Sequence, residues 1–230
     1  KEERQLELDT SKLIPLNIEA GYSDDPDILR AWSLLFERGL FTERNAPEAE
    51  YYLCMEGKFA NRIIIPFKKD GIVYYFQGRA LGDQTPKYLN PSSEIAPNSS
   101  EILYPYDEEA DHLVICEGPL DAKSLQLQGV NATATMKNYV SPRQAEILST
   151  FEGDIILGFD NDDAGHFGCK RFDELRRERL MPDFHVCPPP TGCKDWNEAH
   201  VKGENLRHWV DDKSSLYNFE YKLLNEINSL

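Results

Sequence analysis

The sequence predicts an α/β protein in which a parallel sheet flanked by helices follows a smaller mixed α+β basic subdomain. From His112 onward, short apolar runs alternate with helical stretches, which is typical of a doubly wound parallel sheet. Before it, residues 62–69 and 72–81 are β-like and flank an Asp-Gly pair, a strong hairpin signal. A Pro-, Ser- and Asn-rich connector at residues 90–100 separates the two patterns.

Three domains are therefore expected. Residues 1–100 would form an N-terminal helix and a basic β-rich subdomain, residues 101–205 the parallel-sheet domain, and residues 206–230 a C-terminal helical segment. The last segment is predicted to be helical because apolar residues recur at helical spacing: Leu216, Phe219, Leu223, Leu224 and Ile227.

Individual elements follow from local signals. Residues 28–40 space their apolar side chains by three and four, and Gly39 suits a helix end. Ser141 followed by proline, with Gln144 at the reciprocal position, predicts a capped helix start. Strands are expected at the apolar runs 113–117, 132–136, 154–160 and 184–188.

Composition excludes several classes of protein. No apolar stretch approaches the ~20 residues that span a bilayer, and the charged residues 1–10 do not resemble a leader, so a soluble cytoplasmic protein is expected. The five cysteines are scattered and form no disulfide framework. Cys187, Cys193, His185 and His200 match no standard zinc spacing, so no zinc is expected.

Charge is unevenly distributed. The net charge of −15 is the wrong sign for a protein that covers a duplex. Locally, residues 62–87 carry five basic and two acidic residues, whereas residues 94–121 carry eight acidic residues and no Lys or Arg. An acidic surface that confers solubility is one explanation. The other explanation is that the basic segment contacts phosphate and that the acidic segment beside it binds cations through its carboxylates.

Carboxylates follow the predicted strands where a doubly wound sheet places its ligands. Glu117 ends the first strand and Asp121 lies in the next helix; Asp160 ends the third strand, with Asp162 two residues later; Asp195 follows the fourth. Singly, helix capping or solvation explains each of them. Together they predict a divalent cation that offsets their repulsion, and hard oxygen ligands suit Mg²⁺ or Mn²⁺, one or two ions.

The motif E-G-x-x-D (117–121), followed about forty residues later by D-x-D-x-A-G (160–165), resembles the TOPRIM signature of primases, topoisomerases and some nucleases. The resemblance implies that Glu117, Asp160 and Asp162 are catalytic and hold metal together with Asp195, and that Asp121 orients Glu117 or a water on the ion. A second acid two residues after Asp195 is expected in DnaG-type primases, but this chain has Asn197.

The segment Asn61–Pro91 is similar to the basic subdomain of DnaG-type primases, and the phrases FQGRAL and EGPLD resemble the primase subunit of T-even-like phages. The resemblance assigns Arg62, Arg79 and Lys87 to template or nucleotide; without this motif context, a solvated strand-end charge would explain the two arginines about as well. Candidate binding roles extend to three more residues, the first two with a plainer alternative: Tyr88 (stacking on a base, or packing), Asn90 (a bond to phosphate or sugar, or turn chemistry) and Lys137 (replacing a missing charge).

The predicted function is that of a DNA primase core, which joins ribonucleoside triphosphates into short RNA primers on single-stranded DNA. Implied partners are the single-stranded template, the triphosphates and a replicative helicase, with no membrane. No zinc module is visible, so the chain is expected to be a core fragment or to depend on another part for template recognition. A TOPRIM nuclease and a non-catalytic helicase-binding adaptor remain the alternatives; the D-x-D spacing disfavours a response-regulator-like phospho-acceptor.

Overall fold

The structure, a computed structural model, describes residues 8–41, 49–178, 180–218 and 220–221. The chain forms two compact units, Lys1–Asn98 and Ser99–Leu230. The units therefore divide within the predicted connector at residues 90–100. Within the described ranges, no helix combines the length and the apolar character needed to cross a membrane.

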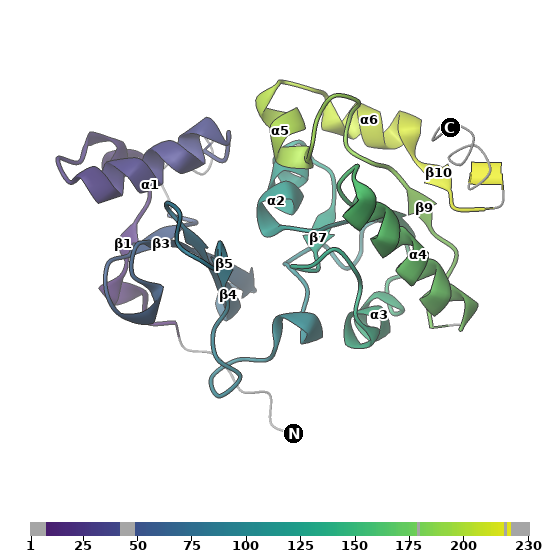
Figure 1. The fold of residues 1–230 in the computed structure, drawn as a ribbon, viewed down its shortest axis with the longest axis horizontal. Helices are drawn as coiled ribbons and strands as arrows, with labels where there is room; N and C mark the ends of the chain where they lie inside the picture. Colours follow the sequence, from purple (N-terminus) through teal and green to yellow (C-terminus); the bar gives the residue numbers. More distant parts are fainter. Residues whose placement is uncertain (1–7, 42–48, 179, 219, 222–230) are drawn as a thin grey trace. The chain divides into compact units, whose positions relative to one another are not determined.

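The first unit is built on an antiparallel sheet in the order β1-β2-β3-β4-β5 (Figure 1). Its strands are β1 (Ile14–Pro15), β2 (Tyr52–Cys54), β3 (Arg62–Lys69), β4 (Ile72–Ala80) and β5 (Tyr88–Leu89). The short helices η1 (Thr10–Lys12), η2 (Ile18–Tyr22) and η3 (Gly57–Phe59) and the longer α1 (Pro26–Glu37) complete it.

The predicted hairpin is confirmed. β3 and β4 pair antiparallel, and the turn between them places both Asp70 (φ 53°) and Gly71 (φ 79°) in the left-handed region, as a two-residue hairpin turn requires. The first helix begins earlier than predicted, at Pro26 instead of Ile28, because the Asp25 carboxylate caps its amino end and proline suits the first helical position. Gly39, at φ 64°, follows its end.

The second unit has the predicted parallel sheet, in the order β10-β9-β8-β6-β7 (Figure 1). β6 (His112–Cys116) pairs in parallel with β7 (Ala132–Ala134) and β8 (Asp154–Leu157), and β8 with β9 (His185–Val186); β10 (Ser215–Leu216) joins antiparallel. The helices are η4 (Ser99–Glu101), α2 (Pro119–Leu127), α3 (Pro142–Leu148), α4 (Asp163–Arg177), α5 (Trp196–Val201) and α6 (Leu206–Lys213).

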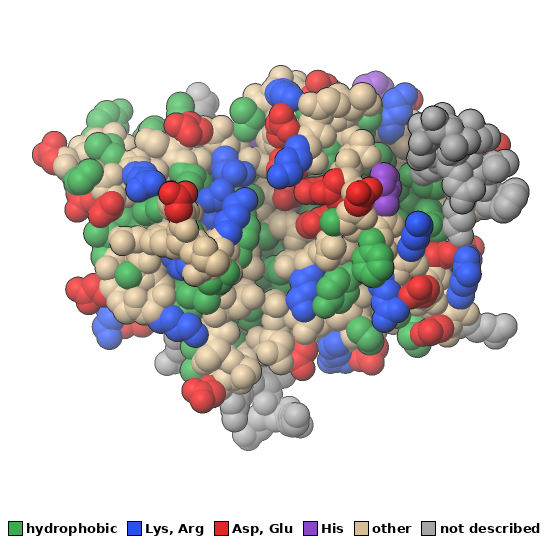
Figure 2. Space-filling model, in the orientation of Figure 1, with side chains coloured by type: hydrophobic (Ala, Val, Ile, Leu, Met, Phe, Trp, Pro, Cys, Tyr) green, Lys and Arg blue, Asp and Glu red, His purple; other side chains and the backbone are tan. Residues whose placement is uncertain are grey.

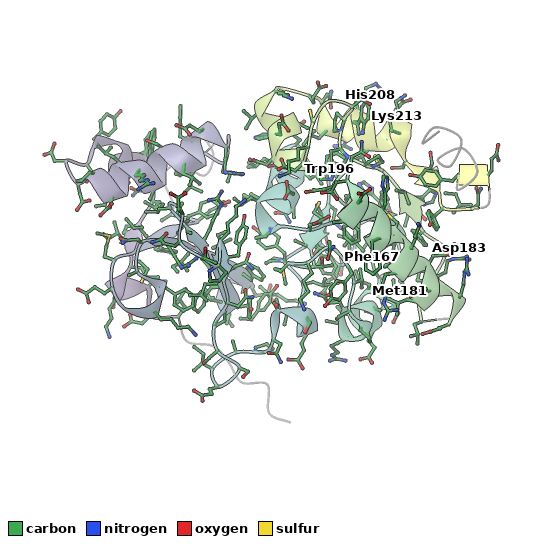
Figure 3. The ribbon with its side chains drawn as sticks, viewed as in Figure 1. Phe167, Met181, Asp183, Trp196, His208 and Lys213 are labelled. Carbon is green, nitrogen blue, oxygen red and sulfur yellow. The ribbon has the colours of Figure 1, made fainter. Side chains whose placement is uncertain are left out.

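Helices cover both faces of this sheet. Alternate strand residues point to opposite faces, so each face carries side chains on which helices pack. One face of β6 and β8 enters the main core with Val140 and Leu148 around α3 and with Phe172 of α4. On the other face, the buried Trp196 indole lies against Gly158 and Val114, at the amino end of α5 (Figure 3). The capping box of Ser141 and Gln144 is confirmed at α3.

The predicted C-terminal helical segment, residues 206–230, begins with the helix α6 (Leu206–Lys213), but the helix does not continue through Leu216. Leu216 lies in β10 opposite His185 and not in a helix, because the chain after α6 extends the sheet at its β9 edge. Residues 206–221 belong to the second unit. Phe219, Leu223, Leu224 and Ile227, on which the rest of the helical prediction depended, lie outside the described residues.

Candidate metal and nucleotide site

Glu117 and Asp160 lie side by side at the carboxyl ends of neighbouring parallel strands. β6 ends at Cys116 and β8 at Leu157, so both acids lie in the loops beyond the strands and not within them as predicted. The backbone N–H of Asp160 donates to Oε1 of Glu117 over 3.3 Å. The parallel pairing of Ile115 with Leu157 brings the two loops together. This is the convergence that the strand-end argument predicted.

The charges of these acids act on one another. Burial, and after it the negative charges of Asp160 and Asp162, raise the pKa of Glu117 from 4.5 to about 7, although the N–H of Asp160 and the charge of Lys194 act to lower it. The three carboxylates therefore share one electrostatic environment. Figure 2 shows acidic side chains gathered on this side of the second unit, beside the amino end of α4.

Asp121 borders the same region. The Cys116 thiol is fully buried, and burial raises its pKa well above the ordinary range, with further contributions from the charges of Asp121, Asp160 and Glu117. One oxygen of Asp121, Oδ1, accepts the backbone N–H of Asn197 over 3.1 Å. The first turn of α5 thus holds one oxygen of the Asp121 carboxylate.

Asp162 is a helix cap, as the plainer explanation predicted, and Asp195 caps a helix as well. Oδ1 of Asp162 accepts the N–H of Gly165 over 2.9 Å at the start of α4, and Oδ1 of Asp195 accepts that of Glu198 over 2.7 Å at the start of α5. A cap uses one carboxylate oxygen, so capping and a contact through the second oxygen are compatible.

Gly165 allows α4 to begin this close to Asp160. A Cβ at residue 165 would lie 2.0 Å from the carbonyl oxygen of Asp160, far inside van der Waals contact. The small residue of the D-x-D-x-A-G motif is therefore required by a backbone approach, and that approach fixes where the Asp160 loop lies.

The donor chemistry fits a hard divalent cation. Glu117, Asp160 and Asp162 offer carboxylate oxygens, and the raised pKa of Glu117 reflects its burial and, after that, a repulsion by the neighbouring acids that a cation would offset. In the described part of the chain, however, no three His, Cys, Asp or Glu side chains are arranged as a ready-made metal site. Binding an ion would require the carboxylates to turn toward it.

A prediction follows for Glu117. Since its folded-state pKa lies above its unfolded value, the folded chain retains a proton that the unfolded chain releases between about pH 4.5 and 7, so stability falls as pH rises through this window. Above it the loss is about 1 to 2 kcal/mol after solvent screening. Without divalent ions, Glu117→Gln should abolish this pH dependence.

Denaturant unfolding of both proteins in EDTA at pH 5, 6, 7 and 8 measures the effect. Mg²⁺ added at pH 8 should raise the melting temperature of the wild type more than that of Glu117→Gln, because it stabilises only a chain that binds it. Parallel pH curves for the two proteins would contradict the assigned environment of Glu117.

Sequence reasoning gave no structural role to three residues of the loop before α5 and its first turn, of which Asn197 was noted only as a departure from an expected acid. Lys194, whose charge lowers the pKa of Glu117, directly precedes Asp195. Trp196 donates its Nε1–H to the carbonyl of Gly158 over 2.7 Å, which ties α5 to the end of β8. Asn197 is almost fully buried. These three residues lie in the phrase CKDWNE, beside Asp195, but only their contacts with distant residues reveal what they do.

The basic residues of the first unit divide between two faces of its sheet. Arg79 pairs with Ile63 and Tyr88, whereas Arg62 pairs with Ala80, one residue further along β4, so the two arginines point to opposite sides. Arg62 is 5% exposed and donates through one terminal nitrogen to the carbonyls of Gly78 and Lys87. Its guanidinium therefore links the backbone of β4 to the residue that precedes β5.

Arg62→Ala should accordingly destabilise the first unit. Two carbonyl oxygens would lose a charged donor in a buried setting, a loss of about 2 to 3 kcal/mol. Chemical denaturation measures it, with Lys68→Ala, an exposed position on the same strand, as the matched control. Equal stability of the two variants would show that Arg62 does not support the sheet.

The other face presents a polar strip. Arg79 is 7% exposed, donates to the carbonyl of Ala80 and lies 5.8 Å from the centre of the Tyr88 ring. The Lys87 ammonium is also 5.8 Å from that centre. Asn90 continues the strip, its Oδ1 accepting from Nε2 of Gln77 over 3.0 Å. Gln77 was not singled out from the sequence, although it immediately precedes Gly78-Arg79.

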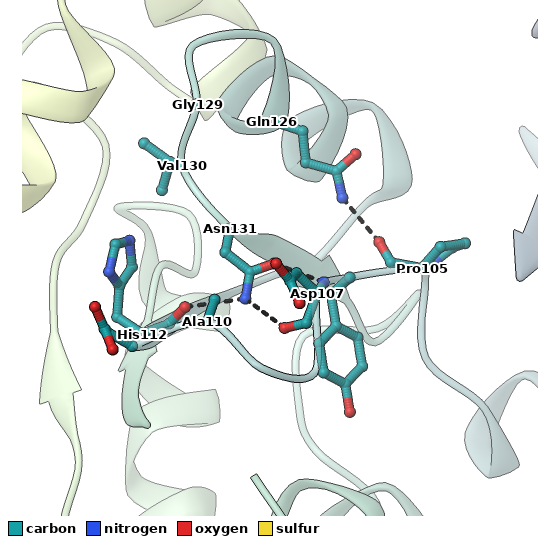
Figure 4. A pocket seen from close by; sticks show the side chains of 10 residues that line it. Pro105, Asp107, Ala110, His112, Gln126, Gly129, Val130 and Asn131 are labelled. Atoms are coloured by element: carbon teal, nitrogen blue, oxygen red, sulfur yellow. Dashed lines mark hydrogen bonds between the residues drawn. The ribbon is translucent and has the colours of Figure 1, made fainter. Parts of the chain in front are cut away.

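Lys137 lies in the loop after β7, where its ammonium donates to the Tyr139 hydroxyl over 3.0 Å and lies above that ring. It belongs to the second unit, as do the acids, whereas the polar strip belongs to the first. A shallow hollow at the opposite, amino end of β6 lies far along the strand from Glu117 (Figure 4). Its lining includes Asp107, His112, Gln126 and Asn131.

Both the sequence of the second unit and the fold of the chain are similar to those of known proteins. Residues 114–200 match a family model described as Toprim-like. The RNA polymerase domain of the Mycobacterium tuberculosis primase DnaG superposes with a TM-score of 0.68 at 22% identity, over 85% of this chain and 79% of that one. A DnaG primase catalytic domain bound to ssDNA gives 0.66 at 21%, over 84% and 74%. The fold is that of a DnaG catalytic core.

Sequence similarity agrees with this fold. The DNA primase of Thermotoga maritima is 35% identical over 179 residues, which are 73% of this chain and 30% of that protein. The chain spans about a third of the length of the curated primases that it matches. The Toprim-like match begins within β6 and ends in α5, so it contains all five acids discussed above.

Proposed function

We propose that this chain is the catalytic core of a DNA primase, which synthesises short RNA primers on single-stranded DNA from ribonucleoside triphosphates. The observation that carries the proposal is the contact between Glu117 and Asp160 at the strand ends of a Toprim-like sheet. The likeness to a DnaG catalytic domain bound to ssDNA supports the choice of template.

Mg²⁺ or Mn²⁺ is the proposed cofactor, and Glu117, Asp160, Asp162 and Asp195 are the residues proposed to hold one or two ions. When bound, the ions supply charge neutralisation for an in-line displacement at a phosphate. Glu117, with its pKa near neutrality, can hold or accept a proton at its carboxylate. Asp121 is proposed to position Glu117 without touching the ion.

The polar strip of the first unit is the proposed contact for template or nucleotide. Arg79 presents a guanidinium that suits phosphate, and Tyr88 presents a ring that suits a base. Lys87, which is exposed, and Asn90 extend the same strip. Lys137 of the second unit is a further candidate for a phosphate contact. Arg62 is proposed to support these residues, since its described bonds go to backbone carbonyls.

The finer proposals rest on sequence likeness. Kinship with the primase subunit of T-even-like phages is supported by FQGRAL and EGPLD, whereas the curated relatives described above are bacterial. A replicative helicase is the proposed protein partner, and the cytoplasm, of the host for a phage protein, the proposed location.

A priming assay tests the function. Single-stranded DNA, all four ribonucleoside triphosphates and Mg²⁺ or Mn²⁺ should yield short RNA, with a larger yield when a replicative helicase is present. Labelled DNA in parallel reactions without triphosphates tests the nuclease alternative, because cleavage needs no ribonucleotides. Cut template in place of new RNA would replace the primase proposal by the nuclease. Neither product, together with helicase binding, would favour the adaptor.

A further inference from the structure

Asn197 occupies the position at which DnaG-type relatives are expected to have a second acid. The structure shows why an amide suits this place. The residue is 3% exposed and lies in the first turn of α5, two residues after the Asp195 cap. A buried amide is costly unless its polar atoms are paired, so its partners show what holds it there.

Two bonds join Asn197 to α2. Its backbone N–H donates to Oδ1 of Asp121 over 3.1 Å, and its side-chain Nδ2 donates to Oγ of Ser124 over 2.9 Å. Asp121 and Ser124 lie one turn apart on α2, so Asn197 bonds to consecutive turns of the same face. The two helices, remote in sequence, are fastened together at this residue.

The hydrogen-bond chemistry requires a donor at residue 197. Ser124, fully buried, already donates its hydroxyl hydrogen to the carbonyl of Leu120 over 2.9 Å. Its oxygen is therefore an acceptor toward Asn197. An amide supplies the matching N–H, whereas a carboxylate would set lone pairs against lone pairs and a second negative charge near Asp121.

The hydrogen bonds between Asn197 and α2 determine where the Asp121 carboxylate lies. Its Oδ2 is 3.0 Å from the position that a Cβ on Gly118 would occupy, so the carboxylate lies directly over the residue after Glu117. Asp121 therefore approaches the peptide that carries Glu117 with one oxygen and accepts from α5 with the other.

We propose that Asn197 is a positioning residue: it fastens α5 to α2 and thereby holds Asp121 against the Glu117 loop in the geometry that the cation site needs. The proposal rests on the proposed function, in that Glu117 and its neighbours hold the metal ion. Residue 197 then acts on the E-G-x-x-D motif (117–121) through Asp121 and is not itself a metal ligand. Asp195 is then the acid of the later motif that is available to bind the ion.

The test compares Asn197→Ala and Asn197→Asp with the wild type. The readouts are the Mn²⁺ dissociation constant from calorimetry on the full chain without nucleotide, and the kcat and KM of primer synthesis. Asn197→Ala keeps the backbone bond and should weaken Mn²⁺ binding by about tenfold, the usual effect of losing a residue that orients a ligand. Asn197→Asp should weaken it more. In both, kcat should fall while the KM for template stays constant.

Asn131→Asp is the matched control. Asn131 likewise donates from its side-chain amide, but to the carbonyls of Asp107 and His112 at the amino end of β6. It should lower the melting temperature and leave Mn²⁺ affinity unchanged. If an Asn197 variant does not fold, Ser124→Ala, which removes the acceptor for Asn197 together with the hydroxyl's own bond to the carbonyl of Leu120, should reproduce the loss of Mn²⁺ affinity.

Unchanged or tighter Mn²⁺ binding by Asn197→Asp would overturn the inference, because it would mark residue 197 as a ligand position. An equal loss in Asn131→Asp would also overturn it, because the effect would then follow from stability alone. A wild type that binds no Mn²⁺ and makes no primers would instead refute the proposed function.

Discussion

Asp160→Asn should reduce primer synthesis by at least about 1,000-fold with little change in stability. The substitution removes a negative charge from the centre of the acid cluster and keeps the side-chain shape. A loss of roughly 4 kcal/mol in stabilising the charge that develops at the phosphate corresponds to that factor. The fold should persist, because the bond between the two acid loops is made by the backbone N–H of residue 160.

The same substitution should change Glu117. Because the charge of Asp160 raises the pKa of Glu117, its removal should lower that pKa below about 7, which NMR titration of the Glu117 carboxyl carbon measures in EDTA. Primer yield measures the activity. Asp163→Ala is the matched control: this acid lies in the same loop region, is exposed, and begins α4. Near-normal primer yield in Asp160→Asn would refute the assigned site.

Gly165→Ala, which adds a single methyl group, should destabilise the site of the second unit strongly. Helix propensity alone would favour alanine by about 1 kcal/mol. The added Cβ, however, would lie 2.0 Å from the carbonyl oxygen of Asp160, a rigid backbone atom, so the loop or the start of α4 must move. Strain of this kind costs about 1 to 3 kcal/mol or more and should outweigh the propensity. Primer synthesis should be lost with it.

Thermal unfolding and the priming assay measure the two effects. Gly203→Ala is a useful control, because Gly203 has φ 81° but nothing within 4 Å of an added Cβ. It should cost about 1 kcal/mol through backbone strain alone and leave priming intact. A Gly165→Ala protein as stable and active as the wild type would mean that α4 and the Asp160 loop can separate freely.

Local signals in the sequence determined most of the architecture. The Asp-Gly turn fixes the hairpin because few residue pairs adopt two positive φ angles, and Ser141 with Gln144 fixes a helix start because each satisfies a backbone N–H of the other. The convergence of Glu117 with Asp160 was also predictable. In a parallel sheet, residues that follow adjacent strands must meet at one edge.

Tertiary structure alone decided what individual side chains do there. That Arg62 and Arg79 face opposite sides depends on the pairing register of β3 with β4, which a one-residue shift would reverse. That Asn197 bonds to Asp121 and Ser124 depends on the packing of α5 on α2, across more than seventy residues of chain. Such contacts leave no local pattern, because they form between residues whose separation in sequence is unrelated to their separation in space.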